Sequence, residues 1–341
     1  MNATTRAEEG RSATGRRRFL GALTGGVIVA SFAAAAQPTR SIPTVGYLGP
    51  PAEVGGFLQA FREGLAELGY VEGRNIHVEY RYNVAIQGNV DRLTDFAAEL
   101  VALKPEVIVV SLGEVALAVK RATSTIPIVM ANVADPVAAG LVESLARPGA
   151  NITGVSRQTS DVIGKQLQLL KELVPANNRF GVLLNPSDRM HSVVAGIVKD
   201  KAESLGVQVN VLSPGTTAEI DGAFRTLRSE RAGAVLVNDG GVLFLSRAQI
   251  AEAALRDRLP SMFSYREPVE MGGLMSYGSS SVANYKRAAY FVNRILKGAK
   301  PADLPIEQSA KFEFVINLKT AKALGIAIPP AMLMRADETL Q

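Results

Sequence analysis

Small polar residues follow the apolar runs of this 341-residue chain, each just before an amphipathic stretch begins. The clearest case is Asp135, which stands between the apolar run "IPIVMA" (126–131) and residues 136–146. Asp accepts hydrogen bonds from the free N–H groups of a first helical turn, and Pro136 suits the position after it. We therefore expect a helix over 136–146. The Asp135 carboxylate could equally bind an ammonium group, and the sequence leaves both roles open.

Other positions in the same setting hold hydroxyl, amide, carboxylate or glycine residues. The first turn of a helix leaves N–H groups free, and it attracts carboxylates and other anions. Two tyrosines in similar places could stack on a ligand. The candidate ligand-binding residues are Pro50, Ser111, Gly113, Asp135, Asn185, Asn238, Asp239, Tyr265 and Tyr277. Helix capping, or core packing for the tyrosines, is the alternative role for each of them.

The residue types that catalyse reactions or bind metal ions are sparse. The chain has no cysteine, and neither His77 nor His191 has a second metal ligand three or four residues later. The sequence lacks the G-x-S-x-G, G-x-x-x-x-G-K-[ST] and G-x-G-x-x-G motifs. We therefore expect a protein that is not an enzyme, with no catalytic residue, no metal site and no cofactor.

Strand-like and helix-like stretches alternate along most of the chain, from "IPTVGYLG" (42–49) to "PSMFS" (260–264). This order predicts parallel sheets covered by helices on both faces. Two successive sets of units favour two doubly wound, Rossmann-like lobes, with a closed eight-stranded barrel as the alternative. Residues 271–316 break the alternation, as if the chain crossed between lobes there. Ligands of such sheets bind at the carboxyl ends of the strands, where the candidate residues lie.

The first 36 residues have the features of an export signal. The order Arg16-Arg17-x-Phe19-Leu20 matches a twin-arginine signal, a mild apolar stretch follows, and Ala34-Ala35-Ala36 offers a cleavage site. We expect export to the periplasm with cleavage near Ala36. A transmembrane anchor and the general secretory route are the alternatives. Without a cysteine at the cleavage point, a lipid anchor is not expected.

The charge of the chain belongs mostly to that signal. Residues 1–36 carry five Arg and two Glu of the chain's 37 basic and 32 acidic residues, so the remainder has a net charge of +2. No dense Lys/Arg stripe remains, and nucleic acid is therefore not an expected partner.

Long segments of the chain resemble one protein family. The segments include "AFREGLAELGYVEGRNIHVEYR" (60–81), "ATSTIPIVMANVADPVAAGLVESLARPGANITG" (122–154), "GGLMSYG" (272–278), "ILKGAKPADLPIEQSAKFEFVINLKTAKALGIAIPP" (295–330) and "MRADETL" (334–340). Over residues 43–339 the chain is similar to the substrate-binding proteins of ABC transporters, in the branch that includes tryptophan and tyrosine uptake proteins.

The resemblance implies a type I periplasmic-binding-protein fold with three crossover strands. By analogy, lobe 1 takes 42–156 plus 279–304, and lobe 2 takes 157–278 plus 305–338. The implied function is capture of a small solute, an amino acid that could be aromatic, by a monomer that delivers it to an ABC permease in the inner membrane. The alternative is a ligand-sensing periplasmic receptor partner without a role in transport.

The resemblance also implies roles for three of the candidate residues. Helix ends and hydroxyls such as that of Ser111 would bind the carboxylate of an amino acid. Asp135 would bind its ammonium group, and Tyr265 would contact its side chain.

Overall fold

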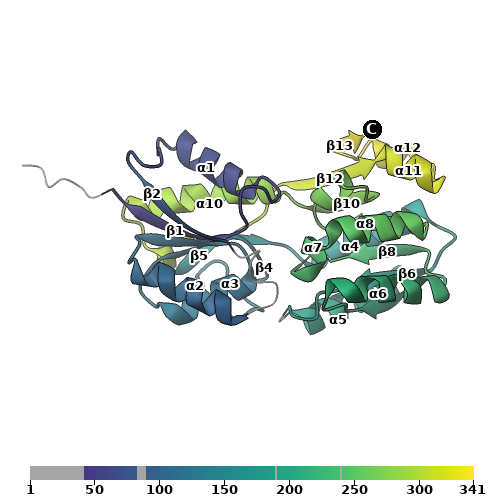
Figure 1. Ribbon diagram of the computed structural model, residues 1–341, viewed down its shortest axis with the longest axis horizontal. Coiled ribbons are helices and arrows are strands. Elements are labelled where there is room, and N and C mark those ends of the chain that lie inside the picture. The colour runs from purple at the N-terminus through teal and green to yellow at the C-terminus, as the bar shows by residue number, and fades with distance from the viewer. Residues whose placement is uncertain (1–41, 83–89, 189, 239) are drawn as a thin grey trace, which may run out of the picture. The chain divides into compact units, whose positions relative to one another are not determined.

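The computed structural model describes residues 42–82, 90–188, 190–238 and 240–341. The predicted export signal over 1–36 and the candidate Asp239 lie outside these residues. Within the described ranges, no helix combines the length and the apolar composition that crossing a membrane requires. The described residues form two separate sheets with helices packed on them, which confirms the predicted two-lobed α/β fold and not the barrel (Figure 1).

The first lobe is a six-stranded sheet with helices on both faces. Its strands are β1 (Thr44–Gly49), β2 (His77–Tyr82), β3 (Val107–Val110), β4 (Ile128–Ala134), β5 (Ile152–Arg157) and β11 (Glu307–Gln308). Its helices are α1 (Phe57–Glu67), α2 (Val90–Ala102), α3 (Gly113–Ala122), α10 (Ser281–Leu296) and the 3-10 turn η2 (Pro301–Asp303).

The strands of the first lobe run in the order β11-β5-β4-β3-β1-β2, and every neighbouring pair is parallel. Successive side chains of a strand point to opposite faces. In β3, Val107 and Val109 pack in a core with α1 and α10, whereas Ile108 and Val110 pack in a core with α2 and α3. Burial on both faces explains why this strand is apolar throughout.

The second lobe is a seven-stranded sheet with its own helices. Its strands are β6 (Arg179–Leu183), β7 (Gln208–Leu212), β8 (Ala234–Val237), β9 (Ser261–Phe263), β10 (Met275–Ser279), β12 (Phe312–Asn317) and β13 (Glu338–Leu340). Its helices are α4 (Ser160–Leu173), α5 (His191–Ser204), α6 (Thr217–Ser229), α7 (Val242–Leu245), α8 (Arg247–Arg256), α9 (Glu267–Glu270), α11 (Leu318–Leu324) and α12 (Pro330–Leu333).

The second sheet has the order β13-β12-β10-β9-β8-β6-β7, and its pairs are parallel except β10 with β12. In this sheet too, successive side chains of a strand point to opposite faces. Val182 packs in a core with α4 and α5, and its neighbour Leu183 packs in a core with α6 and α8. Each lobe therefore has two apolar layers, one on either side of its sheet.

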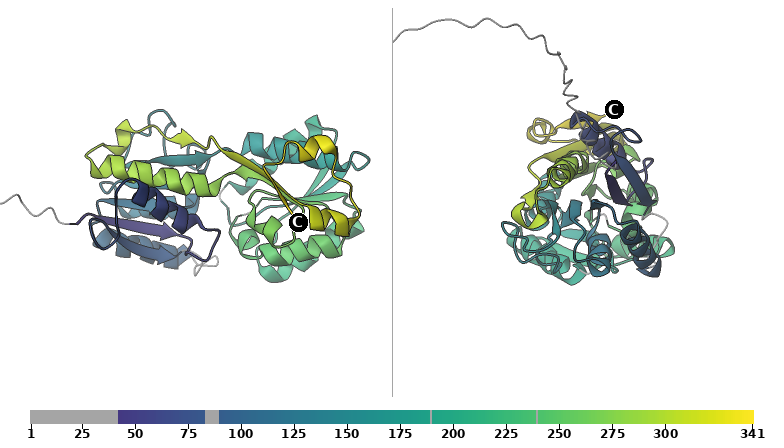
Figure 2. Two further views of the ribbon diagram at one scale, coloured as in Figure 1. Left: turned by 90° about the horizontal axis from the view of Figure 1, so that it is seen from above. Right: turned by 90° about the vertical axis from the view of Figure 1, so that its left-hand side faces the viewer.

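The chain passes between the two sheets three times: after β5, after β10 and after β11 (Figure 2). The passing segments are hydrogen-bonded to one another. The Ser309 N–H donates to the Ser156 carbonyl at 2.8 Å, and the Ser280 N–H donates to the Lys311 carbonyl at 2.9 Å. Two of these passages fall within residues 271–316, where the sequence broke its alternation. The residue numbers predicted to divide the lobes stay a prediction.

The prediction of a helix over 136–146 is wrong, because residues 136–140 form turns and the chain after them is irregular. The Ala139 N–H donates to the Asp135 carbonyl at 3.0 Å, and the Leu141 N–H donates to the Pro136 carbonyl at 2.9 Å. Gly140 then takes a φ of +70°, which ends any helical continuation. Leu141 is fully buried in the core below α3, so tertiary packing and not a helix sets the path of this segment.

An irregularity in β4 directs the segment that ends at Asp135. The register between β4 and β5 shifts between Met130 and Val133. Gly154 lies opposite, with a φ of +128°, and a Cβ added there would lie 2.2 Å from the Met130 carbonyl oxygen. Only glycine fits this approach, because any side chain would push β4 and β5 apart.

Candidate functional site

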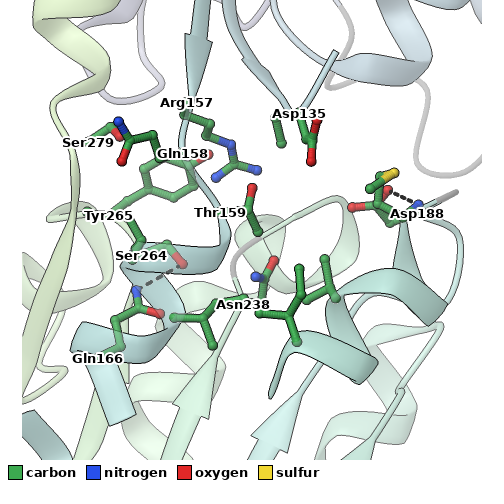
Figure 3. Close-up of a pocket in the computed structure, with 17 residues that line it drawn as sticks. Asp135, Arg157, Gln158, Thr159, Gln166, Asp188, Asn238, Ser264, Tyr265 and Ser279 are labelled. Atoms are coloured by element: carbon green, nitrogen blue, oxygen red, sulfur yellow. Dashed lines mark hydrogen bonds between the residues drawn. The ribbon is translucent and has the colours of Figure 1, made fainter. Parts of the chain in front are cut away.

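A pocket of about 630 Å³, part of it open to solvent, lies at the carboxyl ends of strands from both sheets (Figure 3). We call it the main pocket. The first lobe contributes the ends of β4 and β5. The second lobe contributes the beginnings of α4 and α5, the segments after β8 and β9, and the end of β10. Its lining residues are Ala134, Asp135, Arg157, Gln158, Thr159, Val162, Ile163, Gln166, Asp188, Met190, Val194, Ile197, Asn238, Ser264, Tyr265, Gly278 and Ser279.

Arg157, the last residue of β5, directs its guanidinium into the main pocket (Figure 3). The guanidinium carbon lies 5.4 Å from the centre of the Tyr265 ring. Its Nε is buried and has no hydrogen-bond partner among the described residues. A buried donor without a partner is costly, so the site is suited to a ligand that brings an acceptor.

Asp135 faces the same space and also holds the turn that follows it. Its backbone φ is +32°, and its Oδ1 accepts a hydrogen bond from the Ala138 N–H at 3.2 Å. The capping role considered from the sequence is therefore present, although it caps a turn and not a helix. The carboxylate lines the main pocket as well, so it is placed to contact a ligand.

A buried amide fixes the floor of the main pocket. Gln166 is 1% exposed, and its Nε2 donates to the Tyr277 carbonyl at 2.7 Å and to the Phe263 carbonyl at 3.3 Å. A longer contact of 3.5 Å joins the same atom to the Ser264 hydroxyl (Figure 3). Helix α4 is thereby tied to the ends of β9 and β10, which sets the position of Tyr265.

One wall of the main pocket is aliphatic. It consists of the first turns of α4 and the adjoining face of α5, and its residues are Val162, Ile163, Met190, Val194 and Ile197. An apolar wall opposite a few polar groups is the usual composition of a small-molecule site. Tyr265 is the aromatic residue among those that line the pocket.

Charges of both signs meet at this pocket. Asp135 and Asp188 oppose Arg157 across it. Loss of surrounding water raises the pKa of Glu114, at the start of α3, and the Asp188 carboxylate raises that pKa further, whereas Arg157 lowers it. The pocket therefore suits a small molecule that carries both an anionic and a cationic group.

Of the nine residues predicted from the sequence, Asp135, Asn238 and Tyr265 line the main pocket. Two others, Tyr277 and Asn185, do not line the pocket but make contacts within the second lobe. Tyr277 stacks on Phe312 with ring centres 6.0 Å apart, and Asn185 accepts a hydrogen bond from the Ser187 N–H at 3.2 Å.

Three further predicted residues lie at strand and helix ends of the first lobe, away from the lining of the main pocket. The Pro50 carbonyl accepts from the Tyr47 hydroxyl at 3.1 Å. The Ser111 hydroxyl is buried and hydrogen-bonded to Tyr285. Gly113 is the first residue of α3, with open space beside it. The remaining candidate, Asp239, lies outside the described residues.

Arg157, Gln158 and Thr159 line the pocket but were not among the residues predicted from the sequence. They follow the buried strand "NITGVS" (151–156), a position of the same kind as that of Asp135 after its strand. Gln166 had no comparable signal, because it lies inside a helix and only the packing of β9 and β10 gives it a role.

The described residues contain no group of three or more His, Asp or Glu side chains placed to hold a metal ion. The lining of the main pocket presents one guanidinium, carboxylates, hydroxyls and amides beside an aliphatic wall.

Comparisons with known proteins agree on one family. The family model described as "ABC transporter substrate binding protein" matches residues 53–340. A tyrosine-binding protein of Clostridioides difficile (strain R20291) is 28% identical over 268 residues, which cover 79% of this chain and 76% of that protein. An ABC domain from Streptococcus pneumoniae, solved in complex with L-Trp, is 27% identical with a TM-score of 0.81, and the match covers 88% of this chain and 100% of that one.

A leucine-binding protein from Thermotoga maritima has a similar fold at low sequence identity. It has a TM-score of 0.56 at 12% identity, and the match covers 83% of this chain and 87% of that one. At this identity the likeness concerns the fold alone. It is consistent with the type I periplasmic-binding-protein arrangement of two parallel α/β sheets.

Proposed function

Because the chain belongs to the family of ABC transporter substrate-binding proteins, we propose that it captures an amino acid in the main pocket and delivers it to an ABC permease. Members of this family bind a solute without transforming it, so the protein is not an enzyme. The identity of the solute and the place where it binds are proposals.

The observation that carries the proposal is the pairing of Arg157 with Asp135 in one pocket. A guanidinium can form two parallel hydrogen bonds with a carboxylate. Asp135 would accept from the ammonium group of the same solute. Opposite charges in the lining of one pocket favour a zwitterion, and the unpartnered Nε of Arg157 supplies the donor that such a solute would engage.

The solute's side chain would lie against the aliphatic wall formed by α4 and α5. Ligand sites of this kind are lined mainly by apolar side chains with a few polar groups that fix the orientation of the ligand, and the main pocket has that composition. The related proteins bind tyrosine and hold L-Trp, which supports an aromatic amino acid. The mainly aliphatic lining supports leucine-like side chains as well, so both classes belong in the test.

We propose further that the protein acts outside the cytoplasm. The twin-arginine pattern at Arg16-Arg17 and the small residues before Gln37 support export and cleavage near Ala36. In the periplasm the protein would act as a monomer, because one chain supplies both lobes and every residue of the main pocket.

The experiment is a thermal-shift screen of the mature chain, starting at Gln37, against the twenty amino acids, their amides and a panel of sugars. A solute at a hundredfold excess over its dissociation constant stabilises the folded protein by about 2.7 kcal/mol. We expect apolar amino acids to raise the melting temperature. A response to sugars without any response to amino acids would contradict the proposal.

A further inference from the structure

A row of aromatic rings joins the first lobe to the main pocket. Phe244, on helix α7 of the second lobe, has its ring centre 6.4 Å from that of Phe57 in α1 of the first lobe. Phe57 stacks on Tyr285 of α10 at 5.3 Å with an angle of 11° between the rings. On its other side, Phe244 meets Tyr265 edge-on at 5.6 Å. The contact between the lobes is thus continuous with the pocket wall.

A buried carboxyl lies at the same contact. Glu267, the first residue of α9 in the second lobe, is 7% exposed. The first-lobe loop at Gly55 covers it, since a Cβ on Gly55 would lie 2.7 Å from Glu267 Oε1. Gly55 has a φ of +63°, so glycine alone allows this approach. The second oxygen, Oε2, is buried and has no hydrogen-bond partner within the described part of the chain.

The charges around Glu267 do not compensate for its burial. Its pKa is raised to about 7, mainly by burial, and the nearby Glu270 contributes to the rise, whereas a hydrogen bond from its own backbone N–H acts to lower it. Arg247 and Arg266 lower it. Arg266 is shared between Glu270 at 2.9 Å and Glu338 at 3.0 Å, which limits what it gives to Glu267.

The other charged groups near Glu267 form no ion pair with it among the described residues. Arg247 donates through Nη1 to the Phe244 carbonyl at 2.8 Å and lies over its ring at 4.6 Å, while its Nε is buried without a hydrogen-bond partner in that part of the chain. Glu313 of β12 lies 3.7 Å from Lys311. Glu53, in the covering loop, is exposed. A carboxylate at Glu267 would therefore be buried with a hydrogen bond from its own backbone N–H but without an ion pair among the described residues, which is unfavourable.

A second, smaller pocket connects Glu267 with the solute site. It is lined by Phe57, Glu267 and Glu313, and it shares Ser264, Tyr265, Gly278 and Ser279 with the main pocket. Tyr265 therefore stands between the two spaces. The Ser279 hydroxyl is another buried group without a partner among the described residues.

We propose that Glu267 is a positioning residue that couples solute capture to the uptake of one proton from solvent. With a neutral carboxyl, the Gly55 loop packs against Glu267 and the Phe57 ring packs against Phe244, which in turn holds Tyr265 beside the solute. When the carboxyl ionises, water must reach it, and the contact between the lobes opens. The part concerning the solute rests on the proposed function; the part concerning the contact does not.

The direction of the pH effect follows from the change in the pKa of Glu267. In an opened contact the carboxyl is hydrated and keeps its ordinary pKa of 4.5, whereas the closed contact raises the pKa to about 7. Closing therefore binds a proton between these values and is favoured by acid. If the whole shift depends on closing, affinity for a solute falls by about thirtyfold from pH 5.5 to pH 8.5.

The chain has no tryptophan, so Phe244→Trp places a single fluorescent reporter at the contact. Its emission would be recorded from pH 5 to pH 9 without any solute. We expect a shift to longer wavelength with a midpoint near pH 7. The double variant with Glu267→Gln, which cannot ionise, should keep the short-wavelength emission throughout. Leu245→Trp, at an exposed neighbouring position, serves as the reporter if Phe244→Trp fails to fold.

The matched control is Glu252→Gln, an exposed carboxyl on α8, which should leave the emission curve unchanged. An identical pH curve in the Glu267→Gln background, or no pH dependence in either background, would overturn the proposal. Adding L-leucine and L-tyrosine, without L-tryptophan, at pH 6 then distinguishes the proton-coupling proposal from the amino-acid proposal. If the pH curve is as expected but no amino acid alters the emission, the amino-acid proposal fails and the proton coupling stands.

Discussion

The Arg157 guanidinium lies 5.4 Å from the centre of the Tyr265 ring, although Arg157 ends β5 of the first lobe and Tyr265 follows β9 of the second. The contact brings a cation and an aromatic face from two sheets to the wall of one pocket. The Arg157 Nε is buried without a partner among the described residues. A solute that accepts a hydrogen bond from this atom would therefore satisfy a buried donor.

Replacing Arg157 by Ala should weaken solute binding by about ten- to a hundredfold, because a charge-assisted hydrogen bond is worth about 1.5–3 kcal/mol. Folding stability should change by less than about 1 kcal/mol, since the lost contact is mainly the cation–π pair with Tyr265. Calorimetric titration and urea unfolding measure the two effects. Arg157→Lys keeps the charge but not the planar fork, and it should recover only part of the affinity.

The matched control for Arg157 is Arg225→Ala, an exposed arginine on α6 outside the main pocket. It should leave affinity unchanged. Equal losses in Arg157→Ala and Arg225→Ala would mean that net charge, and not a contact in the pocket, is responsible.

Asp135→Asn separates the two roles of this residue. Asn keeps an oxygen that can accept from the Ala138 N–H, and it tolerates a positive φ, so stability should stay within about 0.5 kcal/mol. The lost negative charge should weaken binding of an amino acid by about tenfold or more. Asp135→Ala should also lower stability, by about 1–2 kcal/mol, because it removes the acceptor. Unchanged affinity in Asp135→Asn would assign the side chain to the turn alone.

Gly154→Ala should destabilise the first lobe by about 3 kcal/mol or more, because the new Cβ would lie 2.2 Å from the Met130 carbonyl oxygen at a φ of +128°. Thermal or urea unfolding measures the effect. Gly196→Ala is the matched change, at a helical position with open space. It should stabilise the protein by about 0.5–1 kcal/mol. Similar stability in the two variants would contradict the close approach of β4 and β5.

A buried hydrogen-bond network should make Asn284 important for stability. Its Nδ2 donates to Asn132 Oδ1 at 2.8 Å, and its Oδ1 accepts from the Ser309 hydroxyl at 2.9 Å. Asn284→Ala leaves the Asn132 Oδ1 buried without this bond, while the Ser309 hydroxyl can still donate to the Ser156 carbonyl at 3.1 Å, so the change should cost about 1–3 kcal/mol in urea unfolding. The exposed Asn178→Ala should cost less than about 0.5 kcal/mol. A loss in Asn284→Ala no larger than in Asn178→Ala would show that the network adds nothing.

The two-sheet fold could be predicted because inner strands such as β3 and β8 are apolar throughout and alternate with amphipathic helices. Burial on both faces of a parallel sheet leaves that pattern in the sequence. The helix expected over 136–146 failed for a tertiary reason. Leu141 packs in the same core as α3, and Gly140 takes a left-handed conformation, so the chain turns where Asp135 and Pro136 predicted a helix.

The site could be predicted only where it follows the strand-end rule. Asp135, Asn238 and Tyr265 follow predicted strands and do line the main pocket. Gln166 lies inside α4, and its role depends on the carbonyls of Phe263 and Tyr277, which are about a hundred residues away in sequence. Contacts of that kind are decided by packing between elements, and no local pattern records them.

The central claim, that the main pocket binds a zwitterion through Arg157 and Asp135, is tested most directly by isothermal titration calorimetry with three related molecules. These are the amino acid with the largest thermal shift, its decarboxylated amine and its deaminated acid. We expect one-to-one binding of the amino acid and at least about tenfold weaker binding of each analogue, because each analogue lacks one charged contact. Binding of the amine or the acid as tight as that of the amino acid would contradict it.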